Sequence, residues 1–123
     1  MKILFTSSIA ARPAHFKMED FEGRRKYNKV RAYNVSKLGV NMAYLEAKAE
    51  CEGTSLLPLL VHPGICYTPL MEKAYPGKVL TLLIKKFIRG FFNDALMGAL
   101  PALFAMQECV EESEFIGPKG IGH

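Results

Sequence analysis

Apolar runs separated by longer amphipathic segments set the pattern of this 123-residue chain. Residues 2–7 (KILFTS) are apolar and partly β-branched, which predicts a buried strand. Residues 55–61 (SLLPLLV) predict a second buried strand that ends at a His-Pro-Gly turn signal. Because Pro58 has no backbone donor, this strand should bulge there or leave that position unpaired. Residues 114–116 are a candidate third short strand.

Three other segments have helical patterns. The longest covers residues 29–51, and Gly53 follows it as a suitable C-cap. One stripe of this helix contains Val30, Tyr33, Lys37, Val40, Tyr44 and Ala47. Residues 78–92 form an apolar helical segment that basic residues interrupt. Residues 95–109 form the last helix, which Pro101 should kink.

Strands separated by helices indicate βαβ units, with a parallel sheet and helices packed on its faces. We therefore expect an α/β fold in which residues 1–123 form one partial domain. Because the first strand begins at residue 2, we expect the chain to be the later part of a larger sheet.

Composition and charge narrow the function classes. Half of the residues are hydrophobic and 23% are charged, which is typical of a globular protein. The basic residues behind the net charge of +4 concentrate within residues 24–31 and 85–89. Neither stretch carries a nucleic-acid-binding motif, so we expect no nucleic-acid partner.

Cys51, Cys66 and Cys109 are widely spaced, so neither a disulfide framework nor a zinc site is expected. Each is predicted to be a small buried apolar residue, although Cys66, beside the Pro-Gly turn, is also placed to face a substrate. The start of the chain does not resemble a signal peptide, and no run reaches the roughly 18 apolar residues of a membrane span. We expect a cytoplasmic location.

The clearest candidate chemistry lies near the start of the long helix. Tyr33 and Lys37 are four residues apart and therefore share one helix face. A phenol has an ordinary pKa near 10 and needs help to act as a general acid or base at neutral pH. One ammonium about 5 Å away favours the phenolate by on the order of 3 kcal/mol. A neighbouring lysine is therefore a sufficient activator.

Tyr44 and Lys48 repeat the same spacing, and their position separates the two pairs. A helix that follows a parallel strand begins at the carboxyl edge of the sheet, where open α/β sheets bind ligands. Tyr33 lies near that start, whereas Tyr44 is about 16 Å further along the helix. We therefore select Tyr33 and Lys37 as the reactive pair and predict that Tyr44 is a packing residue.

Three motifs occur in a characteristic order. Residues 5–10 (FTSSIA) end a strand, residues 32–38 (AYNVSKL) open the long helix, and residues 61–68 (VHPGICYT) follow the next strand. In this order the chain resembles the C-terminal half of the short-chain dehydrogenase/reductase family. The resemblance implies part of a Rossmann-like doubly wound parallel sheet, about three strands with flanking helices. Residues 115–120 (FIGPKG) resemble the retinol-dehydrogenase-like branch.

The resemblance implies roles for individual residues. Ser8 would hydrogen-bond the substrate oxygen, Tyr33 would exchange its proton, and Lys37 would activate the tyrosine and bind the nicotinamide ribose. Ser7 would point to the opposite face. The turn after the second strand would pass beside the nicotinamide of NAD or NADP, and this gives a cofactor-contact role to Pro63, Gly64, Ile65 and Thr68.

The family's nucleotide-binding half has no counterpart in this sequence. It contains no glycine-rich phosphate loop and no fourth catalytic Asn from a preceding helix. The choice between NAD and NADP is therefore open, and we expect the isolated chain to be inactive. An alternative of a different class is a non-catalytic interaction fragment or pseudoenzyme that keeps the motifs by descent.

The resemblance also concerns the substrate and the assembly. Residues 79–92 sit where the family places its substrate-covering lid, and their apolar character favours a bulky hydrophobic alcohol or carbonyl. A membrane surface is the less favoured partner of this segment. The family's long helix commonly packs against a partner subunit, and an unpaired strand edge is adhesive. We therefore expect a homo-oligomer or association with a complementing N-terminal half.

Overall fold

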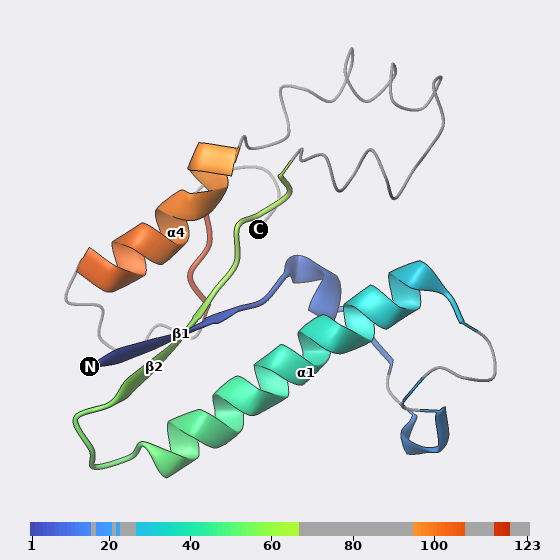
Figure 1. The fold of residues 1–123 in the computed structure, drawn as a ribbon, viewed down its shortest axis with the longest axis horizontal. Coiled ribbons are helices and arrows are strands. Elements are labelled where there is room, and N and C mark those ends of the chain that lie inside the picture. The colour runs from blue at the N-terminus through green and yellow to red at the C-terminus, as the bar shows by residue number, and fades with distance from the viewer. Residues whose placement is uncertain (16, 21, 23–26, 67–94, 108–114, 119–123) are drawn as a thin grey trace.

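The computed structural model describes residues 1–15, 17–20, 22, 27–66, 95–107 and 115–118 (Figure 1). The first elements are β1 (Lys2–Thr6) and the short 3-10 helices η1 (Ile9–Ala11) and η2 (Met18–Asp20). They are followed by the helix α1 (Lys29–Glu50), the strand β2 (Leu57–Val61) and the helix α4 (Ala95–Gln107). The predicted helix over residues 78–92, which includes the lid segment, lies outside the described residues.

The two strands form a parallel pair whose register runs without interruption from Lys2 opposite Leu57 to Thr6 opposite Val61. The alternative of a bulge at Pro58 is therefore wrong. The Leu57 N–H donates to the Met1 carbonyl at 2.8 Å, so the backbone N–H and C=O groups of the odd-numbered residues of β2 point toward β1. Backbone groups alternate in direction along a strand, so the nitrogen of Pro58 points to the edge of β2 that faces away from β1. The missing N–H therefore costs the β1–β2 pair no hydrogen bond.

The third predicted strand is represented by one parallel bridge between Ile116 and Val61. The Ile116 N–H donates to the Leu60 carbonyl at 2.9 Å, and the His62 N–H donates to the Ile116 carbonyl at 2.8 Å. Residue 114 lies outside the described residues. Among those described, the sheet therefore consists of two strands with this bridge beside β2, rather than of three strands.

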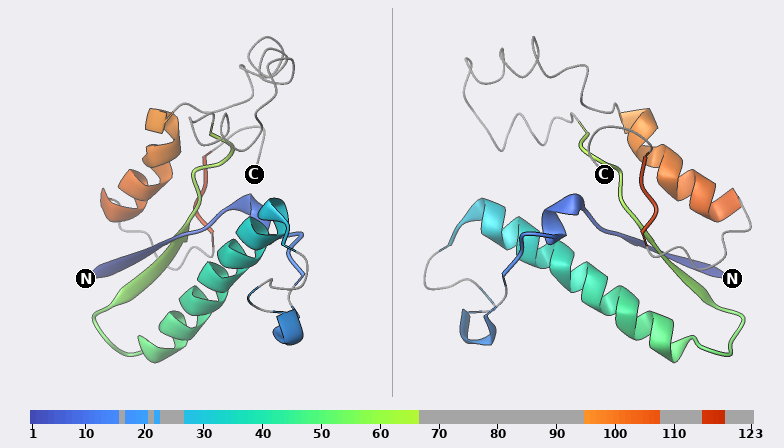
Figure 2. Two further views of the ribbon diagram at one scale, coloured as in Figure 1. Left: turned by 45° about the vertical axis from the view of Figure 1, so that its right-hand side comes forward. Right: turned by 180° about the vertical axis from the view of Figure 1, so that it is seen from behind.

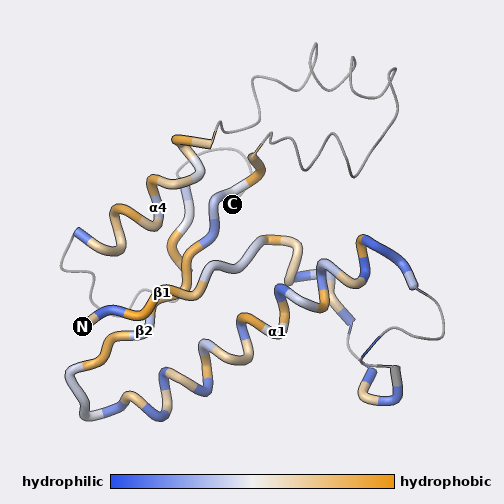
Figure 3. Tube along the Cα trace, viewed as in Figure 1, coloured by the Kyte–Doolittle hydropathy of each residue, from blue (hydrophilic) through white to orange (hydrophobic). Residues whose placement is uncertain are grey.

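The helices α1 and α4 lie on opposite sides of the two strands (Figures 1 and 2). The core between β2 and α4 contains the buried side chains of Leu59, Val61, Ala105 and Ile116. The trace is largely hydrophobic along β2 and α4 (Figure 3). On the other side, Tyr44 of α1 places its ring edge-on to Phe5 of β1, with centroids 6.0 Å apart. A parallel sheet covered by helices on both faces is an α/β arrangement, as predicted.

Side-chain hydrogen bonds satisfy backbone groups at the start of α1 and at the end of α4. The Asn28 side-chain oxygen accepts the Arg31 N–H at 3.0 Å and so caps the start of α1. The helix ends at Glu50, one residue before the predicted boundary, and Gly53 follows with a positive φ of 76°. At the end of α4, the Lys2 ammonium donates to the Ala105 carbonyl at 2.7 Å. This bond satisfies a carbonyl that has no partner within the helix.

One face of α4 remains exposed and apolar. Its exposed large side chains are Leu96, Met97, Leu100, Leu103, Phe104 and Met106. Pro101, which was expected to kink this helix, occupies an interior position of the helix and is buried. Within the described residues, no helix combines the length and the apolar character that crossing a membrane requires.

Candidate functional site

The carboxyl end of β1 carries the two serines of the first motif. Ser8 has an extended backbone, with φ of −153° and ψ of 151°, and it caps the short helix η1. Its Oγ accepts the Ala10 N–H at 3.2 Å, and the side chain is 9% exposed. A hydroxyl that accepts one bond keeps its own proton available for donation. Ser8 is therefore fixed in place and still able to donate.

The helix α1 crosses this strand end and is bonded to it. The Lys37 ammonium donates to the Thr6 carbonyl at 3.1 Å. The Ser7 Oγ donates to the Asn41 Oδ1 at 2.5 Å, and the Lys37 carbonyl lies 3.4 Å from the same Oγ. Ser7 and Ser8 thus direct their hydroxyls to different elements. Asn41 was not singled out in the sequence; the available signal is its place one helical turn after Lys37 on the same face.

Tyr33 lies one turn before Lys37, with the Lys37 Nζ 5.9 Å from the centroid of its ring. This distance lies within the range of cation–π contacts. The Tyr33 side chain is 46% exposed, so an incoming molecule can reach the phenol. The structure therefore brings Tyr33 and Lys37 together beside the strand end that carries Ser8. Their catalytic roles stay predictions.

The competing pair on α1 has a different environment. Tyr44 is 4% exposed and packs against Phe5. The prediction that Tyr44 is a packing residue is confirmed. Of the two tyrosines with a lysine four residues later, Tyr33 is the one whose side chain is open to solvent.

The turn after β2 lies at the same edge of the sheet as Ser8, because β1 and β2 are parallel. His62 is 3% exposed, and its Nδ1 accepts the Gly64 N–H at 3.2 Å. Gly64 has a φ of 72°, in the left-handed region that favours glycine. Pro63 and Gly64 are half-buried and Ile65 is exposed, whereas Thr68 lies outside the described residues.

The cysteines are less buried than predicted. Cys51 and Cys66 are free thiols of intermediate burial, and Cys109 lies outside the described residues. The Cys66 Sγ donates to the Pro63 carbonyl at 3.2 Å, which keeps it within the turn. A side chain at Gly98 of α4 would overlap this sulfur, so a glycine there permits α4 to approach the turn.

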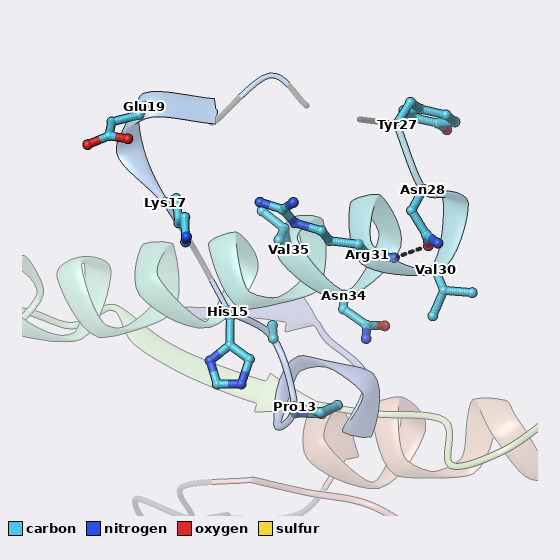
Figure 4. Close-up of a pocket in the computed structure, with 11 residues that line it drawn as sticks. Pro13, His15, Lys17, Glu19, Tyr27, Asn28, Val30, Arg31, Asn34 and Val35 are labelled. Atoms are coloured by element: carbon cyan, nitrogen blue, oxygen red, sulfur yellow. Dashed lines mark hydrogen bonds between the residues drawn. The ribbon is translucent and has the colours of Figure 1, made fainter. Parts of the chain in front are cut away.

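A separate cavity of about 990 Å³ opens beside the first turns of α1 (Figure 4). Its lining comes from the loop before η2, from η2 itself, and from the start of α1 with the two residues before it: Pro13, Ala14, His15, Lys17, Glu19, Tyr27, Asn28, Val30, Arg31, Asn34 and Val35. Ser8, Tyr33 and Lys37 are not part of this lining. Across the described ranges, no group of three metal-ligating side chains comes together.

Comparison with known proteins finds a similarity to a dehydrogenase. The chain is 26% identical over 102 residues to mouse (Mus musculus) retinol dehydrogenase 12. The aligned region covers 83% of this chain and 31% of the mouse protein, so the chain spans about a third of that relative's length. No protein-family profile matches the chain, and no solved structure matches it.

We predict that Gly117→Ala disrupts the turn after β2. The His62 ring packs against Phe115 with centroids 4.3 Å apart, and a Cβ at Gly117 would lie 2.5 Å from the His62 Cε1. The substitution should lower the free energy of unfolding by about 1–3 kcal/mol, because the buried ring must move. Urea unfolding measures this change, and a shifted His62 ring resonance would locate it.

Gly39→Ala is the matched control for this prediction. A Cβ at Gly39 meets nothing within 4 Å in the interior of α1. It should stabilise the chain by about 0.5–1 kcal/mol through helix propensity. If the two substitutions changed stability equally, the packing of Gly117 on His62 would be refuted.

Proposed function

We propose that this chain is the catalytic half of a short-chain dehydrogenase/reductase-type oxidoreductase that interconverts an alcohol and a carbonyl with NAD(H) or NADP(H). The similarity to mouse retinol dehydrogenase 12 supports an oxidoreductase at a coarse level. The observation that carries the proposal is the contact of an exposed tyrosine with a lysine beside Ser8, at the carboxyl edge of a parallel sheet.

The residues of this edge fit the nicotinamide end of a dinucleotide. An ammonium has three N–H donors, and the Lys37 bond to the Thr6 carbonyl uses one of them. The others are available to ribose hydroxyls. Ile65 is exposed on the neighbouring turn and offers an apolar contact to the nicotinamide ring. The dinucleotide would supply or accept the hydride.

The proposed proton transfer uses groups of this chain. In the reductive direction the substrate oxygen accepts hydrogen bonds from the hydroxyls of Ser8 and Tyr33, and Tyr33 then gives its proton to that oxygen. The Lys37 ammonium, 5.9 Å from the centroid of the Tyr33 ring, lies beside this proton transfer. Oxidation follows the same steps in reverse. Ser8 orients and polarises the substrate, and its fixed position reduces the reorganisation needed in the transition state.

We extend the proposal to partners and location. The substrate class is a bulky hydrophobic alcohol or carbonyl, and the location is cytoplasmic. The strand β1 lies at the edge of the described sheet and can accept a further strand from a second copy or from a complementing N-terminal half. The exposed apolar face of α4 favours the second candidate function, a non-catalytic interaction fragment.

Tyr33→Phe tests the proposed reaction in an assembly of this chain with a complementing nucleotide-binding half, fused or added as a separate chain. We expect kcat/KM for an apolar aldehyde to fall by about 10²–10⁴-fold, because the proton donor is lost. Dinucleotide binding should remain. Tyr44→Phe is the matched control and should keep its activity, because that ring packs within the fold. Full turnover by Tyr33→Phe would exclude the proposed role.

The 123 residues alone should bind no dinucleotide. Remote binding of the pyrophosphate and adenosine supplies much of the free energy that positions a nicotinamide, and this sequence has no phosphate loop to contribute it. We expect no saturable heat change in calorimetry at micromolar NADP or NAD, and no oxidation of NADPH by long-chain aldehydes. Adding the complementing half should restore both. Tight binding by the chain alone would contradict the assignment of its residues to the catalytic half.

A further inference from the structure

We propose that Ser7 and Asn41 are positioning residues that hold the Ser8 hydroxyl in reach of Tyr33 and Lys37. This inference rests on the proposed function. Neither side chain touches the proposed substrate, so each would act through its effect on the placement of Ser8.

Ser7 is buried and bonded to both the sheet and the long helix. Its side chain is 2% exposed, which makes it more deeply buried than the Ser8 beside it at 9%. Its N–H donates to the Val61 carbonyl of β2 at 2.8 Å. Its Oγ donates to the Asn41 Oδ1 of α1 at 2.5 Å. One residue, adjacent in sequence to Ser8, therefore joins the sheet to the helix.

Two residues of α1 that bond to the strand end are one helical turn apart. Tyr33, Lys37 and Asn41 follow one another at intervals of four residues and share one helix face. Lys37 is bonded to the Thr6 carbonyl, and Asn41 is bonded to Ser7. Successive residues of the strand end thus meet successive turns of the helix. Fixing Asn41 on Ser7 fixes how far the helix can slide or turn relative to Ser8.

Two acceptors, the Asn41 Oδ1 and the Lys37 carbonyl, lie near the Ser7 hydroxyl. A hydroxyl has one proton to donate, and the alternative acceptor, the Lys37 carbonyl, lies 3.4 Å away. That distance is beyond the usual range for an O–H donor. The Asn41 oxygen is therefore the effective partner. Without it, Ser7 would have to move toward the helix backbone, and Ser8 would move with it.

The first measurement uses the 123-residue chain itself. In Asn41→Leu the acceptor is removed at similar side-chain volume, and we expect amide hydrogen exchange to accelerate at least about tenfold at residues 8–10. Asn41→Asp keeps an acceptor oxygen and should restore slow exchange. Met42→Leu is the control, because Met42 neighbours Asn41 but is 54% exposed. Unchanged exchange at residues 8–10 in Asn41→Leu would overturn the inference.

The second measurement is steady-state kinetics in the assembly with the nucleotide-binding half. Asn41→Leu and Ser7→Ala should each lower kcat about ten- to hundredfold while changing KM little, because misplacement of Ser8 affects the transition state. The double variant should be no worse than either single one, because both remove the same contact. Asn41→Asp should recover most of kcat. A merely structural role would instead lower the fraction of folded protein and leave kcat per folded molecule unchanged.

The outcomes separate this inference from the proposed function. A folded, active wild-type assembly with an equally active Asn41→Leu variant would overturn the positioning role and leave the reaction standing. A wild-type assembly that binds the dinucleotide but has no activity would overturn the proposed function and this inference with it. Additive losses in the double variant would show that Ser7 and Asn41 act separately, which also contradicts the inference.

Discussion

Ser7 joins the sheet to the long helix through two hydrogen bonds. Its N–H bonds to Val61 in β2, its Oγ bonds to Asn41 in α1, and the side chain is almost fully buried. A buried hydroxyl that loses its partner costs about 1–3 kcal/mol. The angle at which α1 crosses the end of β1 is constrained by these bonds. The placement of Ser8 relative to Tyr33 depends on that constraint.

Features set by local periodicity were predictable. Both strands, the long helix and the α/β arrangement follow from apolar runs and from the helical spacing of apolar residues. The choice between Tyr33 and Tyr44 also succeeded in separating the exposed ring from the packed one, because distance along a helix translates directly into distance from the sheet edge. The positions of Tyr33 and Lys37 on one face needed only the helical repeat.

Features that depend on contacts between residues far apart in the chain were not predictable from the sequence. Pro58 needs no bulge because its nitrogen points away from β1, which becomes clear only once the register is known. The burial of His62 depends on Phe115 and Gly117, more than 50 positions away. The bond from Ser7 to Asn41 likewise joins residues separated by 34 positions. The helical repeat places Asn41 on the face of Lys37, but nothing in the sequence indicates which strand residue it bonds.

We propose that a hydride is transferred at the edge of the sheet that carries Ser8, with Tyr33 and Lys37 beside it on α1. The most direct measurement follows deuterium from NADPH or NADH labelled in turn on each face of nicotinamide C4 to an apolar aldehyde, in the assembly of this chain with a nucleotide-binding half. Mass spectrometry should find one deuterium on the carbinol carbon of the alcohol with one of the two labelled faces. An assembly that binds the dinucleotide but forms no alcohol, or forms alcohol without deuterium from either face, would contradict the account.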